Sequence, residues 1–371
     1  MNLEFNTDRR RFLKLAGLAA ASAALPKPAW SIAPSGRNRI YVVSDIHIGD
    51  DSPTCWYQKR YHEPYLLRIL DEVIANRDEV RELVLLGDVV DFWTYAPDVR
   101  PPTFEAIAAA NPNVFGPRGK LVEVLRALEG RVTVLQGNHD LGFTQQDWNA
   151  IRTPEGVAPR LVGDLYLPLG QANPRLVLAH GHLYTMFNAP DPTTPFAPLP
   201  VGHYVTRSVA HKVRNQIAGT AQTAADLAGQ GAPNGMDIRG AFVSIAQDAP
   251  ALASTSPDVV TLMLDMVRDT CGMKDDTVII LPGGRESSLR EAKVRYHDLW
   301  DRWKRAGGGG YAGGTLALKA LQADAQAKYL GWFAQKLAIE RGAELVVMGH
   351  TTSRSRVSST RPARAGPSAT T

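Results

Sequence analysis

The chain has 371 residues, of which 44% are hydrophobic and 21% are charged, a composition typical of a globular protein with one large domain or two small ones. The formal net charge of +4 is concentrated in residues 1–33 and 353–371, so the body between them is net acidic, which argues against a nucleic-acid partner held by bulk charge. Two cysteines, Cys55 and Cys271, are too few for a disulfide framework or a cysteine-based zinc site.

The N-terminus predicts an export signal over residues 1–33. Arg9-Arg10-Arg11-Phe12-Leu13-Lys14 precedes a short apolar run and then proline and small residues, a pattern that looks like a twin-arginine signal. The apolar run is shorter than the roughly 18 residues that a membrane-spanning helix needs. We therefore expect a periplasmic or secreted protein that uses the twin-arginine export machinery and has no stable membrane span. The alternative is a basic amphipathic helix.

From residue 39 onward, short β-rich runs alternate with helical stretches, which is the pattern of an α/β sheet protein. The predicted strands are residues 39–44, 83–86, 132–136, 160–167, 174–179 and 344–348. The predicted helices between them are residues 63–76, 117–128 and 319–341.

Residues 189–318 break this alternation and are predicted to form a helical insertion or cap beside the site. The segment begins with a proline-rich run and contains patterns for helices at 205–218, 257–269 and 288–304, for a strand at 277–281, and for a glycine-rich loop at 307–314. The glycine-rich run has no strand before it and no Lys-Ser/Thr after it. It is therefore predicted to be a flexible loop and not a phosphate-binding loop.

Polar motifs begin where five of the apolar runs end. They are Asp45, Gly87-Asp88, Gly137-Asn138, His180 and Gly349-His350. Because ligands of such sheets bind at the carboxyl ends of the strands, we expect these five segments to converge on one edge.

The first two motifs have the chemistry of a metal site. Asp45 and His47 are two residues apart, so they share one face of an extended chain and can hold one ion together. Asp88 can bridge two ions, because the glycine before it allows a tight turn. Asp91 is better placed to support a ligand by hydrogen bonding than to be one.

The later motifs add further donors. Asn138 offers an amide oxygen, and the imidazole of His139 next to it is free to act on a leaving group. His180 and His350 offer imidazole nitrogens. His182 is predicted either to orient a substrate or to cap its loop.

The ordered series D-x-H, GD-x-x-D, GNHD, H-G-H and GH, which runs from Asp45 to His350, resembles the calcineurin-like metallophosphoesterase superfamily. Residues 44–49 and 87–93 are similar to those of UDP-2,3-diacylglucosamine pyrophosphohydrolases, which work in the cytoplasm, so the export signal argues against the same substrate. The resemblance implies a metallophosphoesterase domain over residues 34–352. Its fold would be a layered α/β/β/α sandwich of two packed sheets flanked by helices, with a helical insertion.

The resemblance also implies a site with two divalent metal ions, whether manganese, iron or zinc. One ion would bind Asp45, His47 and Asp88, and the second would bind Asp88, Asn138, His180 and His350. A hydroxide between the ions would attack phosphorus, and His139 would protonate or stabilise the leaving oxygen. Asp140 would orient the His139 ring. Asp91 and His182 would contact the substrate or support the ligands.

The C-terminal part departs from this pattern. The superfamily motif G-H-x-H corresponds here to Gly349-His350-Thr351-Thr352, and a threonine hydroxyl is a poor substitute for imidazole on a transition metal. Residues 353–371 have almost no apolar side chains and are predicted to be a disordered or out-of-frame tail. A shift of reading frame near Thr351 would explain both departures. The alternative is a natural tail with a threonine substitution.

The sequence therefore predicts metal-dependent hydrolysis of a phosphate ester or anhydride, in which a dinuclear metal-activated hydroxide attacks a small-molecule or lipid-linked phosphate. One alternative is a nucleotide-sugar or lipid pyrophosphohydrolase. Another is a degenerate, non-catalytic phosphate- or metal-binding protein, which the missing histidine makes plausible. No nucleic-acid partner is expected.

Overall fold

The computed structural model describes residues 36–190, 199–229, 258–325 and 327–350. The expected export signal, Thr352 and the tail at 353–371 lie outside the described residues. Among the described residues, no helix combines the length and the apolar character needed to cross a membrane.

The first sheet is parallel and has the order β1-β2-β3-β4. Its strands are β1 (Arg39–Val43), β2 (Val80–Leu86), β3 (Val132–Leu135) and β4 (Arg160–Leu161). The helices between these strands are α2 (Lys59–Ala75), α3 (Phe104–Ala110), α4 (Pro112–Phe115), α5 (Lys120–Ala127) and α6 (Gln145–Trp148). The parallel order puts the carboxyl ends of β1, β2 and β3 side by side.

The second sheet has the order β5-β6-β9 and mixes both directions. Its strands are β5 (Leu165–Tyr166), β6 (Leu176–Ala179) and β9 (Leu345–Met348). β6 and β9 run parallel although more than 160 residues separate them in sequence, while β5 pairs antiparallel with β6. The ends of β6 and β9 therefore also lie side by side.

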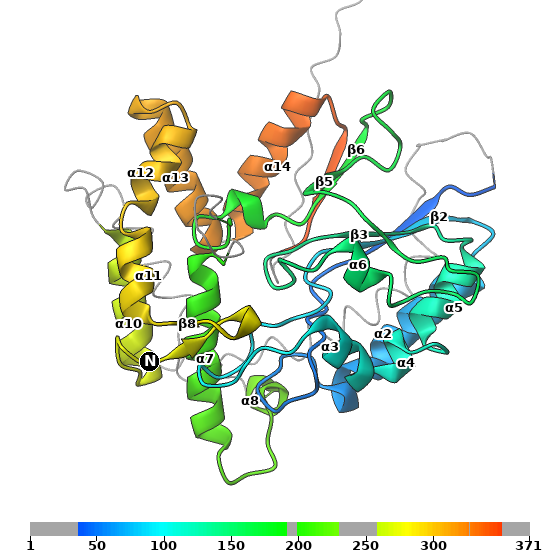
Figure 1. Cartoon of the computed structure of the whole chain (residues 1–371). Coiled ribbons are helices and arrows are strands. Elements are labelled where there is room, and N and C mark those ends of the chain that lie inside the picture. Colours follow the sequence, from blue (N-terminus) through cyan, green and yellow to red (C-terminus); the bar gives the residue numbers. More distant parts are fainter. Residues whose placement is uncertain (1–35, 191–198, 230–257, 326, 351–371) are drawn as a thin grey trace, which may run out of the picture.

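The alternating side chains of β2 show how the layers pack. Leu83 and Leu85 point into a core shared with the helices α2 to α6, and Val84 and Leu86 point into a core shared with Leu178 of the second sheet. The other face of the second sheet packs on α14 (Ala327–Arg341) through a third core. Figure 1 shows this order of helices, two sheets and α14. The expected α/β fold, with a parallel sheet and flanking helices, is confirmed.

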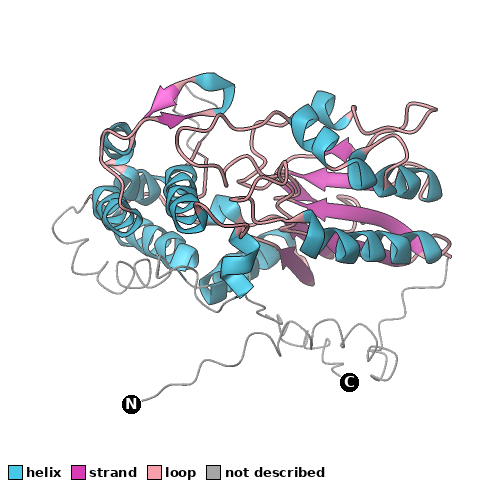
Figure 2. Ribbon diagram, turned by 90° about the horizontal axis from the view of Figure 1, so that it is seen from below, coloured by secondary structure: helices cyan, strands magenta, loops and turns pink. Residues whose placement is uncertain are grey.

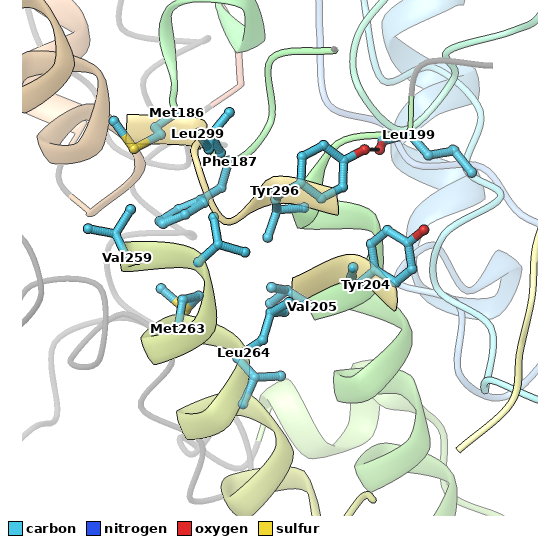
Figure 3. Packing of buried hydrophobic residues seen from close by; sticks show 14 of the residues in the cluster. Met186, Phe187, Leu199, Tyr204, Val205, Val259, Met263, Leu264, Tyr296 and Leu299 are labelled. Carbon is cyan, nitrogen blue, oxygen red and sulfur yellow. Dashed lines mark hydrogen bonds between the residues drawn. The ribbon is translucent and has the colours of Figure 1, made fainter. Parts of the chain in front are cut away.

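A further group of helices has a core of its own. It contains α7 (Val201–Ile217), α10 (Val259–Cys271), α11 (Leu289–Tyr296), α12 (Leu299–Ala306) and α13 (Gly310–Ala325). Figure 3 shows side chains of α7, α10 and α11 packing on Met186 and Phe187, and the Tyr296 hydroxyl donating a hydrogen bond to the Leu199 carbonyl. Figure 2 shows the two sheets and their flanking helices on one side of the molecule and the helical group, with a short strand pair, on the other.

Smaller elements complete the described fold. The short 3-10 helix η2 (His182–Tyr184) follows β6, and α8 (Ala224–Gly229) follows α7. The hairpin of β7 (Ile279–Ile280) and β8 (Glu286–Ser287) encloses the 3-10 helix η3 (Pro282–Gly284).

Some sequence predictions differ from the structure in more than the position of their ends. The strand expected at 160–167 is split into β4 and β5, because the chain crosses there from the first sheet to the second. The helix expected at 288–304 is divided into α11 and α12. The helix expected at 319–341 falls in α13 and α14, and residue 326 between them lies outside the described residues. The loop predicted at 307–314 is wrong in its second half, because residues 310–314 form the start of α13. A Cβ at Gly313 would lie 2.2 Å from the Lys304 carbonyl oxygen, so glycine allows α12 and α13 to approach closely.

A buried arginine connects the helical group to the loop that follows β2. Arg207 of α7 is fully buried, and its Nη2 donates hydrogen bonds to the carbonyl oxygens of Ala96, Pro97 and Val99 at 2.9, 3.0 and 2.6 Å. Pro97 also accepts a hydrogen bond from the Ile280 N–H of β7. The loop is therefore held to α7 by Arg207 and to the hairpin by the Pro97 carbonyl.

We predict that Arg207→Met destabilises the protein. Methionine retains the apolar volume but leaves buried carbonyl oxygens without a donor, which costs about 1–3 kcal/mol for a buried unpaired group. Chemical denaturation measures the change in the free energy of unfolding. The matched control is Arg214→Met on the same helix, where the exposed ion pair with Asp98 contributes at most about 1 kcal/mol. Equal effects of the two substitutions would contradict this role.

Candidate functional site

The predicted site residues meet at one edge of the sandwich. Asp45 and His47 follow β1, Asp88 follows β2, Asn138 and His139 follow β3, His180 follows β6 and His350 follows β9. Among the described residues, two groups place potential ligand atoms within 4.8 Å of one another, namely His47, Asp88 and His139, and Asp88, His180 and His350. Asp88 belongs to both groups. Asp45 belongs to neither.

Four of the polar residues at this edge have a strained backbone conformation. Asp45, His47, Asp88 and His350 have φ angles of 57°, 57°, 51° and 66°, in the left-handed region that residues with a Cβ rarely adopt. Such a residue costs on the order of 1–3 kcal/mol and persists only where its surroundings hold it. Here the Asp45 N–H donates to the Gly87 carbonyl at 3.2 Å and the His47 N–H to the Asp88 carbonyl at 2.8 Å.

Three glycines allow the polar side chains to approach one another. A Cβ at Gly87 would lie 2.5 Å from His180 Nδ1, and a Cβ at Gly137 would lie 2.2 Å from Asp88 Oδ1. A Cβ at Gly349 would lie 2.0 Å from Ser44 Oγ. No side chain larger than hydrogen fits these three positions without moving the site.

His180 and His47 both direct their Nε2 atoms toward Asp88. His180 Nδ1 lies 2.8 Å from the Leu86 carbonyl oxygen, which can only accept, so this nitrogen carries the proton and donates. His180 Nε2 then faces Asp88 Oδ2 at 3.1 Å. His47 Nδ1 lies 3.1 Å from Asp91 Oδ2, and its Nε2 lies 3.8 Å from Asp88 Oδ2. Hydrogen bonds of this kind fix the ring orientation of metal-binding histidines.

Asp91 holds two histidines at once. Its Oδ2 contacts Nδ1 of His47 and, at 3.0 Å, Nδ1 of His139, while its Oδ1 accepts the N–H groups of Trp93 at 2.7 Å and Thr94 at 3.2 Å. Burial opposes ionisation, but the charge and hydrogen bonds of His139 and His47 hold the pKa of Asp91 below its ordinary value.

The contact expected between Asp140 and the His139 ring is made by Asp91. Asp140 instead accepts the N–H groups of Gly137 at 2.6 Å and Val89 at 3.0 Å. Burial and the nearby Asp88 raise the pKa of Asp140 to about 7. Asp140 therefore ties the loop after β3 to the loop after β2.

Asn138 leaves its oxygen free at the site. Its Oδ1 is buried and makes no hydrogen bond. Buried acceptors without partners are rare in folded proteins. A cation at this oxygen would satisfy it, and imidazole, carboxylate and amide donors together suit zinc, iron or manganese. The residues present therefore fit divalent metal ions.

His182 lies beside the second group. Its ring centroid is 5.4 Å from that of His180, the residue is 1% exposed, and neither ring nitrogen has a hydrogen-bond partner. Burial and the charge of His180 lower its pKa to about 3. His350 completes the second group, and its backbone N–H donates to Asp45 Oδ2 at 3.1 Å. This contact places the Asp45 carboxylate at the site.

Two tryptophans flank His139. The Trp93 ring is fully buried, with its centroid 4.3 Å from that of His139. Trp56 lies 5.1 Å from His139 and 4.9 Å from His47, and it remains 41% exposed. The sequence alone predicts no role for Trp93, although its position two residues after Asp91 is a signal.

Residues 38–208 match the family model for calcineurin-like phosphoesterases. The matched range contains the motifs from Asp45 to His182, and His350 lies beyond it. No curated protein and no solved structure matches the chain. Over this range the chain is similar to calcineurin-like phosphoesterases, a family that implies divalent metal ions.

We predict that Gly137→Ala disturbs the site, because its Cβ would displace the Asp88 carboxylate. Overpacking of this kind costs about 1–3 kcal/mol. Thermal unfolding of the metal-free protein and manganese content after reconstitution measure the effect. The control is Gly163→Ala, where a Cβ meets nothing within 4 Å. Unchanged manganese binding in Gly137→Ala would argue against the close packing at Asp88.

We also predict that metal binding releases protons. Nearby carboxylates outweigh burial and raise the pKa values of His47 and His180 to about 9 in the metal-free protein. Both imidazoles are then protonated at about pH 7.5 and must lose a proton to bind an ion, so metal affinity rises as the pH rises toward about 9. Calorimetry in buffers with different ionisation enthalpies counts the protons. A pH-independent affinity without proton release would contradict the assignment.

Proposed function

We propose that this protein hydrolyses a phosphate ester or anhydride with the help of two divalent metal ions. The observation that carries the proposal is the shared Asp88, where two groups of ligand side chains meet at one buried carboxylate. Two adjacent cation positions that share a carboxylate are the arrangement that dinuclear hydrolases use. The match to the phosphoesterase family points the same way.

The ligands divide between the two positions on either side of Asp88. In the first group, His47 and Asp88 would hold one ion together with Asp45, and His139 would be left for the leaving oxygen. Asp88, Asn138, His180 and His350 would hold the other ion. Bound divalent ions lower the pKa of water and neutralise charge on phosphoryl oxygens. Asp91 keeps the His47 ring oriented with Nε2 toward the first position.

His139 supplies the proton for the leaving oxygen. Its Nδ1 is held by Asp91, so Nε2 is the atom that donates. The Asp91 carboxylate fixes the orientation of the ring. Trp93 packs on the ring and limits its rotation.

One observation favours a nucleotide-sugar or lipid pyrophosphate as the substrate class. Trp56 offers an exposed aromatic surface beside His139, where the leaving group would lie. A flat or apolar leaving group would contact this surface favourably. We also propose export by the twin-arginine route, which rests on the paired arginines of residues 9–11.

Turnover of p-nitrophenyl phosphate and bis-p-nitrophenyl phosphate by metal-stripped protein resupplied with manganese tests the proposal. We expect His139→Ala to lower kcat by about 10²–10⁴-fold, the usual contribution of a general acid. Its manganese content should equal that of the wild type. The control is His297→Ala, an exposed histidine on the end of α11.

Other outcomes separate the alternatives. A fall in manganese content in His139→Ala would make His139 a ligand. Manganese binding without turnover would favour the non-catalytic binding protein. Turnover that appears only in Thr352→His would show that the fold is right and the first ion position lacks a ligand.

A further inference from the structure

A chain of hydrogen bonds leads from the helical group to the candidate ligand Asn138. Asn138 Nδ2 donates to Asn188 Oδ1 at 3.3 Å, and Asn188 Nδ2 donates to Asp324 Oδ1 at 3.0 Å. Asp324 lies on α13, and its second oxygen accepts the Phe187 N–H at 2.9 Å. Neither Asn188 nor Asp324 belongs to a recognised motif.

The Asp324 carboxylate sets the donor and acceptor directions of these hydrogen bonds. An ionised carboxylate can only accept, so Asn188 must present its NH₂ group to Asp324. The Asn188 oxygen is then left facing Asn138, which must present its own NH₂ group in turn. The Asn138 oxygen consequently points away from Asn188, and this is the buried Oδ1 without a hydrogen-bond partner.

A reversed amide at Asn138 would be unfavourable. Its oxygen would face the Asn188 oxygen across about the same distance, and its NH₂ group would face the ion position. The network therefore selects the one orientation of Asn138 that allows metal binding.

The surrounding backbone is shaped to hold Asn188. A Cβ at Gly202, in the first turn of α7, would lie 2.1 Å from Asn188 Oδ1, so only glycine admits the side chain. The Gly202 N–H donates to the Phe187 carbonyl at 2.7 Å, and the Met186 N–H donates to the Ala320 carbonyl at 3.2 Å. Helices α7 and α13 thus clamp the segment 186–188 from two sides.

We propose that Asn188 is a positioning residue for the second metal ion, with Asp324 setting the orientation of its amide and thereby that of Asn138. This inference rests on the proposed function, since it requires the Asn138 oxygen to be a ligand. It assigns the helical group a part in metal binding through α13.

Manganese titration of the metal-stripped protein by calorimetry tests the inference. Burial raises the pKa of Asp324 to about 7, so the titration is made at about pH 8, where the carboxylate is ionised. We expect Asn188→Ala to weaken the second manganese by about 10–100-fold, as loss of a group that orients a ligand usually does. The control is Asn113→Ala, which removes an exposed hydrogen bond to Glu63.

A double-mutant cycle separates positioning from general structural damage. In an Asn138→Ala background, Asn188→Ala should cause no further loss of manganese affinity, because the ligand it orients is absent. An equal further loss would overturn the inference.

The combined variant Asn188→Asp with Asp324→Asn supplies a rescue. A carboxylate at position 188 accepts from Asn138, and an amide at position 324 can donate to that carboxylate, so the orientation of Asn138 is retained. We expect this pair to restore affinity that Asn188→Asp alone loses through repulsion with Asp324. Full affinity in Asn188→Ala would also overturn the inference.

Failure of the proposed function gives a different result. If wild-type protein binds no manganese, or if Asn138→Ala binds it as well as wild type, the Asn138 oxygen is not a ligand and both proposals fall. If Asn138→Ala weakens binding and Asn188→Ala does not, only the positioning role is overturned.

Discussion

The buried carboxylate of Asp88 is the constraint on which the rest of the site depends. It is 2% exposed at the end of β2, where an ionised group requires cations or hydrogen bonds. The His139 N–H donates to its Oδ1 at 2.7 Å, and its Oδ2 faces the imidazoles of His47 and His180. Although burial opposes ionisation, the nearby His180 and His139 hold its pKa below the ordinary value. Both groups of candidate ligands meet at this one side chain.

The packing of two sheets brings the donors to Asp88. The first sheet supplies the residues that follow β1, β2 and β3, and the second supplies His180 and His350. Val84 and Leu86 pack against Leu178, so the carboxyl edges of both sheets lie at the same level. Left-handed backbone at four of the donors then turns their side chains toward a common centre.

The helical group is joined to the site through several contacts. Trp93 belongs to its core and also packs on His139, and Arg207 fixes the loop that begins a few residues after Trp93. Asp324 of α13 is connected to the site through Asn188. The apolar contacts that bury the helices therefore also hold polar side chains around the candidate ligands. A rearrangement of these helices would therefore change the contacts of His139 with Trp93 and of Asn138 with Asn188.

The sequence by itself determined the α/β pattern and the polar residues that follow the strands, because strand periodicity and turn glycines are local properties. It also indicated which residue types could bind metal. Only the tertiary structure decided that Asp91 holds His47 and His139, that residues 160–167 cross between sheets, and that α13 extends over half of the glycine-rich run. These features depend on contacts between segments far apart in the chain. No local pattern in the sequence shows whether Asp91 or Asp140 contacts the His139 ring.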